Sequence, residues 1–96
     1  MTFEWDPAKA ASNLAKHRVS FELAQLVWND PLYVLLPDRN DPETGEQRWH
    51  AIGTVGGQAL LLVVHTYPNP DNEDHVRIIG ARKATSHERK RYEAEL

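Results

Sequence analysis

The chain has 96 residues, of which 41% are hydrophobic and 26% charged, and its net charge is −3. The composition is too apolar for a disordered chain, and the length suits a single domain over residues 1–96. The absence of cysteine excludes disulfides, thiol catalysis and cysteine-based zinc sites. The longest apolar run, residues 59–64, is far below the roughly 20 residues that span a bilayer, and the acidic start does not resemble a signal peptide. We therefore expect a cytoplasmic protein with no membrane partner.

The first third of the chain predicts two helices. Asp6 caps the first, and Pro7 suits its first turn because the missing backbone N–H would have no helical partner there. This helix is expected to run to about Lys16, with an apolar stripe formed by Ala8, Ala11, Leu14 and Ala15. Ser20 caps the second helix, residues 21–28, which ends before an Asn-Asp-Pro sequence.

Four strands are expected next, and Phe3 to Trp5 are interpreted only as an extended entry. The strands span residues 32–36, 48–55, 58–67 and 75–82. Gly56 and Gly57 predict a type I′ hairpin turn, because both central positions of that turn need positive φ. Short connections favour antiparallel pairing of neighbouring strands.

A last helix is predicted from Thr85 to about Glu95. Thr85 and Glu88 have the spacing of a capping box, in which each side chain accepts a hydrogen bond from a free backbone N–H at the helix start. The sequence thus predicts an α+β fold with two N-terminal helices, a small antiparallel four-stranded sheet and a C-terminal helix.

Positive charge gathers around the start of that last helix. Residues 76–91 contain six Lys or Arg and one acidic residue, whereas the whole chain is negative. A basic segment on an acidic protein indicates a local site for an anion, and phosphate is the commonest candidate. The alternative is a solvated strand end and helix face, which is what most charge clusters are.

Metal and nucleotide motifs are missing. The five histidines, at positions 17, 50, 65, 75 and 87, show neither i, i+4 spacing nor a His-Glu-x-x-His motif. The stretch from Asp38 resembles a calcium loop, but its sixth position is Glu43 where a glycine is needed. There is no glycine-rich phosphate loop and no Gly-x-Ser-x-Gly sequence. We expect no metal and no cofactor.

Arginine and histidine on the strands point to RNA chemistry. Period-2 alternation places Arg48 and His50 on one sheet face, and Arg82 on a face with Ile78 and Gly80. RNA cleavage without a metal needs groups that move protons between the 2′-OH and the leaving 5′ oxygen, and cations that neutralise the phosphate. His and Arg serve these two roles.

Other interpretations of these residues remain open. His65 shares a face with Leu61 and Val63, where a packed role is the commoner one. His75 and His87 lie beside turns, where they are solvated. Arg48 has Glu46 nearby as an ion-pair partner.

A set of short motifs resembles the BrnT toxin family of the BrnT/BrnA type II toxin–antitoxin system. They run from Phe3 to Glu93 and comprise Phe3-Glu4-Trp5-Asp6-Pro7, Lys9, Asn13, Lys16-His17, Val19-Ser20-Phe21-Glu22-x-Ala24, Asp30-Pro31, Gly45-Glu46-x-Arg48, Arg77-Ile78-Ile79-x-Ala81-Arg82-Lys83-Ala84, Glu88-Arg89 and Tyr92-Glu93. The chain departs from the family pattern at Arg18, where Gly is usual, and at Gly80, where Ser is usual before Ala-Arg.

The resemblance implies a fold related to RelE/ParE toxins and a metal-independent endoribonuclease that arrests translation. It also implies a cytoplasmic BrnA-like antitoxin, which would silence the nuclease and connect it to DNA only indirectly. We expect an acidic or amphipathic segment of that partner to cover residues 76–91. If the hydroxyl missing at Gly80 matters to the family, activity here would be weak.

Two hypotheses follow for the function. In the first, the chain is a ribonuclease: Arg82 and Lys83 stabilise the phosphate, Arg48 orients it, His17 or His50 transfers protons, and the RNA strand is bound by Lys16, Arg77, Arg89 and Lys90. In the second, the basic segment docks a protein or nucleic acid without chemistry. The net charge of −3 argues against broad non-specific nucleic-acid binding and favours a small focused site.

Overall fold

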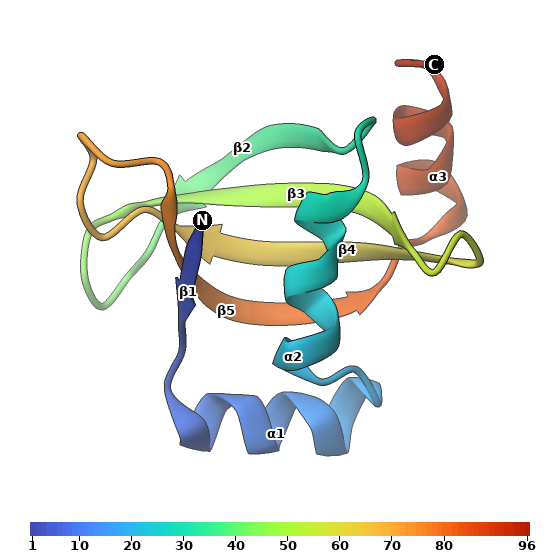
Figure 1. The fold of residues 1–96 in the computed structure, drawn as a ribbon. Helices are drawn as coiled ribbons and strands as arrows, with labels where there is room; N and C mark the ends of the chain where they lie inside the picture. The colour runs from blue at the N-terminus through green and yellow to red at the C-terminus, as the bar shows by residue number, and fades with distance from the viewer.

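The sheet of this protein has five strands in the order β1-β5-β4-β3-β2 (Figure 1). The computed structural model describes all 96 residues. Its elements are β1 (Thr2–Glu4), α1 (Pro7–His17), α2 (Phe21–Ala24), the 3₁₀ helix η1 (Gln25–Asn29), β2 (Val34–Asn40), β3 (Gln47–Val55), β4 (Ala59–Thr66), β5 (His75–Lys83) and α3 (Ser86–Glu93). None of the helices combines the length and apolar character that a membrane crossing requires.

The α+β class predicted from the sequence is confirmed, but the predicted sheet was wrong in one strand. Thr2 to Glu4 form β1 and pair in parallel with residues 75–77 of β5, so the sheet is five-stranded and mixed. The other neighbouring strands are antiparallel, as predicted. A three-residue strand that pairs with a segment some seventy residues away leaves no hairpin signal in the sequence.

The local signals at helix starts and at the tight turn are confirmed. Asp6 accepts a hydrogen bond from the backbone N–H of Ala8, and Ser20 accepts one from Leu23. Both halves of the predicted capping box at the start of α3 are present. Gly56 and Gly57 have φ of 65° and 69°. The second helix differs from the prediction, since only Phe21–Ala24 is α-helical before the chain tightens into η1.

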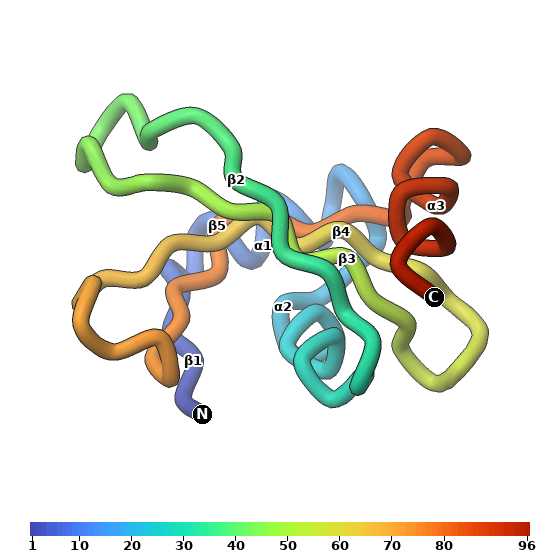
Figure 2. Tube along the Cα trace, turned by 90° about the horizontal axis from the view of Figure 1, so that it is seen from above, coloured from blue at the N-terminus to red at the C-terminus, as the bar shows by residue number.

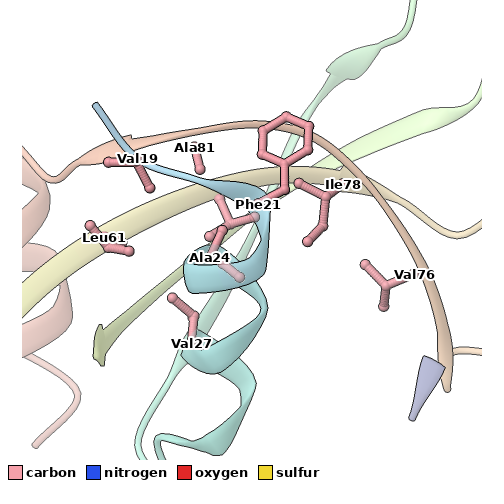
Figure 3. Packing of buried hydrophobic residues seen from close by; sticks show 10 residues of the cluster. Val19, Phe21, Ala24, Val27, Leu61, Val76, Ile78 and Ala81 are labelled. Carbon is pink, nitrogen blue, oxygen red and sulfur yellow. The ribbon is translucent and has the colours of Figure 1, made fainter. Parts of the chain in front are cut away.

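One face of the sheet, the core face, carries the larger hydrophobic cluster. Ala51, Leu61, Val63, Val76, Ile78 and Ala81 point from three strands toward α2 and η1. The segment that contains α2 and η1 fills the cluster with side chains that are almost completely buried, as Figure 3 shows: Val19, Phe21, Ala24 and Val27. Phe21 is the largest of these, so it anchors the helical layer to the sheet.

Helix α1 packs in a way that its sequence does not predict. The expected apolar stripe is exposed, with 48% of Leu14 accessible, and none of the helix residues is fully buried. The helix is held instead by Ala10 against the core and by Asn13 at the free edge of β5. The Asn13 amide accepts from the Ala81 N–H at 3.1 Å and donates to the Ala81 and Val19 carbonyls at 2.9 Å, as a neighbouring strand would.

The opposite face, the open face, carries His50, Ile52, Leu62, Val64 and Arg82, and only part of it is covered. Helix α3 covers one end through Tyr92, which packs with Ile52 and Leu62. Its hydroxyl donates to Asp30 at 2.7 Å, and the same carboxylate oxygen accepts from Thr54. Figure 2 shows α3 and the loop between β2 and β3 on this side of the sheet, with α2 on the other.

A bulge in β5 decides which cations share the open face. Val64 pairs with Gly80 but His65 pairs with Ile78, so Ile79 is an extra residue in the ladder. Alternation therefore changes phase, and Arg82 lies opposite the face of Ile78, contrary to the prediction. Arg77 and Arg82, five residues apart, consequently both lie on the open face.

Candidate functional site

His50 lies on the open face, and a carboxylate fixes its ring. Asp38 Oδ2 lies 3.2 Å from His50 Nε2 and 3.8 Å from Arg48 Nε. Burial works to raise the pKa of Asp38, but the backbone N–H of Arg39 and the two basic neighbours lower it below the usual value. An ionised Asp38 has no hydrogen to donate, so His50 Nε2 carries the hydrogen and Nδ1 is free to accept a proton.

Arg82 is held across the same face by α3. Its guanidinium makes two hydrogen bonds to Glu88, at 2.7 and 2.8 Å. Arg82 lowers the pKa of Glu88 to about 2, and Glu88 in turn raises the pKa of Arg82. Because Glu88 also accepts from the Thr85 N–H in the capping box, one carboxylate fixes both Arg82 and the start of α3.

Arg77 forms an ion-pair cluster near the other end of the open face. It donates to Glu4 at 3.0 Å and to Glu46 at 3.1 Å. His75 bonds the second oxygen of Glu4, which joins β1 to β5 through side chains as well as backbone. Glu46 therefore pairs with Arg77, and the alternative in which Arg48 pairs with Glu46 is wrong, since Arg48 contacts Asp38 instead.

Two buried donors beside this cluster have no hydrogen-bond partner within the protein. They are Arg48 Nε and Thr66 Oγ1. Thr66 pairs with Arg77 in the ladder and is completely buried. Buried polar groups are nearly always hydrogen-bonded, so these two atoms are exceptions on the open face.

A third set of cations lies along α1. Lys9, Ser12, Asn13, Lys16 and His17 form a polar stripe at helical spacing and line a cavity of about 210 Å³ with Ile79. Neither lysine takes part in an ion pair. Hydrogen bonds from the backbone of Glu43 and Thr44 lower the pKa of Asp41 in the loop between β2 and β3, and the charge of Lys9 contributes.

The structure thus separates the residues predicted for the site into groups. Arg48, His50, Arg77 and Arg82 share the open face, whereas Lys16 and His17 line the α1 cavity. Lys83 is exposed and pairs with Leu61 of the core face, so it points away from Arg82. Arg89 and Lys90 are exposed on α3. No three His, Asp or Glu side chains are grouped to hold a metal ion.

Sequence reasoning missed the carboxylates that organise the site. The predicted strand ends at Leu36 and leaves Asp38 in a loop, whereas β2 continues to Asn40. The sequence predicts only a capping role for Glu88. Gly80 lies opposite Val64 on the open face, and a Cβ there would meet only ordinary contacts, the nearest 3.7 Å away at Asn13 Oδ1. A serine would therefore fit at this position.

Comparison with known proteins identifies the family. The family described as "Ribonuclease toxin, BrnT, of type II toxin-antitoxin system" matches residues 5–88, most of the chain. The crystal structure of the Brucella abortus ribonuclease toxin BrnT superposes with a TM-score of 0.66 and 24% identity, over 90% of this chain and 99% of that one. Comparison with curated proteins finds no match. The chain belongs to the BrnT family of ribonuclease toxins from type II toxin–antitoxin systems.

Proposed function

We propose that this protein cleaves RNA on its open face without a metal ion and so inhibits translation. The observation that carries the proposal is His50, oriented by Asp38, with Arg48 on the same strand and Arg82 two strands away on the same face. A base whose ring is oriented by a third group is the usual arrangement for activating a nucleophile. Family membership supports the ribonuclease class of this reaction.

In the proposed step, His50 Nδ1 takes the proton of a ribose 2′-OH. The 2′ oxygen attacks the adjacent phosphorus and the bond to the 5′ oxygen breaks; that oxygen takes a proton from solvent as it leaves, and protonated His50 later returns its own proton to solvent. The products are a 2′,3′-cyclic phosphate and a free 5′-hydroxyl. Arg48 and Arg82 neutralise the charge that grows on the phosphate.

The cations without acidic partners lie around this site rather than in it. Lys9 and Lys16 flank it on α1, and Arg89 and Lys90 lie on α3. We propose that they hold the RNA strand on either side of the cleaved bond. Arg82 then has to exchange Glu88 for phosphate, which is a replacement of one anion by another.

The test is cleavage of a defined RNA by the purified protein in EDTA, with analysis of the new ends. His50→Ala is expected to lower the cleavage rate about 10²-fold or more, the scale of losing a positioned base. His87→Ala is the matched control, because His87 is exposed on α3 and its side chain makes no hydrogen bond or ion pair. Activity that disappears in EDTA and returns with Mg²⁺, or equal rates in the two variants, would contradict the proposal.

A non-catalytic binding module is the second candidate. It is favoured by one observation: each arginine of the open face already has a carboxylate partner. A module of this kind would retain RNA or protein without producing cyclic phosphate ends. The same assay separates the two, since only the nuclease generates new ends that depend on His50.

We further propose that a BrnA-like antitoxin silences the nuclease by docking on the exposed cations of residues 76–91, and that it provides the only connection to DNA. The exposed members are Lys83, Arg89, Lys90 and Arg91. Association should slow steeply as salt rises, because exposed charges are screened over about 8 Å at physiological ionic strength. Stopped-flow mixing with Arg89, Lys90 and Arg91 changed to Ser measures the effect, and Arg39→Ser is the control. A rate indifferent to salt and to the triple change would exclude this docking site.

A further inference from the structure

A cleft of about 300 Å³ lies at the end of the sheet away from α3. Trp49 of β3 and Tyr67 after β4 form its aromatic part, and Pro68 and Pro70 line it beside them. Glu46, Gln47 and Glu73 supply the polar lining. Trp49 pairs with His65, so the aromatic part belongs to the core face and not to the face that carries His50.

The rings of the cleft are held in place from behind. The His65 Nδ1–H donates to the Val63 carbonyl at 3.2 Å, so Nε2 accepts from the Tyr67 hydroxyl at 3.3 Å. A row of edge-to-face contacts runs from Trp28 through His65 and Tyr67 to Trp49, with centroids 4.9, 5.2 and 6.3 Å apart. The aromatic lining is therefore ordered before anything binds.

Both loops that border the cleft are acidic. The loop between β2 and β3 and the loop between β4 and β5 lie at one end of the sheet in Figures 1 and 2. Residues 38–47 and 68–74 together carry seven carboxylates and one arginine. Glu73 is exposed and has no ion-pair partner, whereas Glu46 bonds Arg77. An RNA base that stacked here would bring its phosphate against these carboxylates, so nucleic acid is disfavoured.

We propose that this cleft binds an arginine side chain on an extended segment of a partner protein. A guanidinium stacks on an aromatic face and pairs with a carboxylate at the same time, and it does so better than the compact ammonium of lysine. Trp49 and Tyr67 provide the faces, and Glu73 provides the carboxylate. Trp49, Tyr67 and Glu73 have no role in the proposed nuclease reaction. The acidic cleft also lies at the end of the sheet away from the basic helix α3.

The probe is a capped Gly-Arg-Gly-Arg-Gly peptide, titrated into the ¹⁵N-labelled chain. The indole N–H signal of Trp49, identified with Trp49→Phe among three tryptophans, should shift and saturate. The lysine version of the peptide should bind more weakly, and the glutamate version should not shift the signal. A single-stranded oligodeoxythymidylate, which cannot be cleaved at a 2′-OH, tests the nucleic-acid alternative.

A matched pair of variants distinguishes the cleft from general attraction to an acidic surface. Glu73→Gln removes a charge that lines the cleft, and Glu43→Gln removes one from the neighbouring loop that does not. Both residues are exposed, so neither change should disturb folding. We expect Glu73→Gln to weaken peptide binding about threefold to tenfold, on the scale of an ion pair formed at a partly desolvated site, and Glu43→Gln to leave it nearly unchanged.

Several outcomes would overturn the inference. Equal weakening by the two variants would show diffuse electrostatics. A Trp49 signal that ignores the arginine peptide would leave the cleft without its proposed ligand, and stronger shifts with the oligonucleotide would assign the cleft to nucleic acid.

Discussion

The two faces of the sheet place a histidine side chain in opposite environments. His65 on the core face is completely buried, and burial lowers its pKa to about 4. His50, one residue beyond the ladder partner of His65, lies on the open face beside Asp38 and remains partly accessible. The core face thus keeps an imidazole neutral and packed, whereas the open face gives an imidazole a carboxylate partner and leaves it partly accessible.

The difference extends to the rest of each face. The core face is stabilised by apolar burial under α2 and η1, which needs only side chains of suitable shape. The open face is organised by ion pairs that join segments far apart in sequence, such as Glu46 with Arg77. Exposed ion pairs stabilise a fold little, so we interpret the charges of the open face as functional groups held ready.

The largest expected effect is on the core face, where His65 should make the free energy of unfolding depend on pH. The folded chain binds the His65 proton only near pH 4, and an unfolded chain binds it near pH 6.5. Between these values the unfolded state holds more protons, so stability present above pH 6.5 is lost as pH falls toward 4. The loss should reach about 3 kcal/mol in the free energy of unfolding, at 1.36 kcal/mol per pKa unit.

Urea unfolding at several pH values measures this loss. In His65→Phe the slope between pH 6.5 and 4.5 should largely disappear, because the remaining groups with lowered pKa are carboxylates that act mainly below that range. His87→Gln, at an exposed histidine, should keep the slope. A His65→Phe protein with the same slope as the unmodified chain would refute the assignment.

The second-largest expected effect is on the open face and concerns the rate of RNA cleavage. Arg82→Ala should lower RNA cleavage about 10²-fold, the scale of losing one donor to the transition state. The change also frees Glu88 and loosens the start of α3, so Glu88→Gln serves as the matched variant, since its amide oxygen can still accept from the Thr85 N–H. Glu88→Gln should retain or raise cleavage because it weakens the hold on Arg82. If both variants lose activity in proportion to their loss of stability, Arg82 is structural.

These faces could be predicted from the sequence to different degrees. Gly56, Gly57 and the Thr85 capping box act within a few residues, so their structure follows from local chemistry. The bulge at Ile79 and the pairing of β1 depend on contacts made only after folding, and they determine where Arg77 and Arg82 point. The predicted strand stops at residue 36, but β2 is an edge strand that tolerates the missing N–H of Pro37, and it continues far enough to bring Asp38 to His50.

The smallest expected effect is on the stability of the fold at a residue that belongs to neither face, so it serves as a control for the comparison between the two faces. Arg18 follows α1 with φ of 60°, in the left-handed region where its N–H bonds the Leu14 carbonyl. Glycine adopts this conformation without the steric penalty of a Cβ. Arg18→Gly should therefore stabilise the fold by about 1 kcal/mol, less the larger entropy that glycine has when unfolded.

Arg18→Ala keeps the Cβ and should bring no such gain, which separates conformational relief from loss of the charge. Thermal unfolding of the three proteins gives the ranking, with an increase in Tm of about 4–8 °C expected for each kcal/mol in a domain of this size. Since Arg18 contacts none of the residues around His50, RNA cleavage should be the same in all three at a temperature where each is folded. A glycine variant no more stable than the alanine variant would show that the left-handed residue carries no strain, and a change in cleavage would place Arg18 in the RNA path.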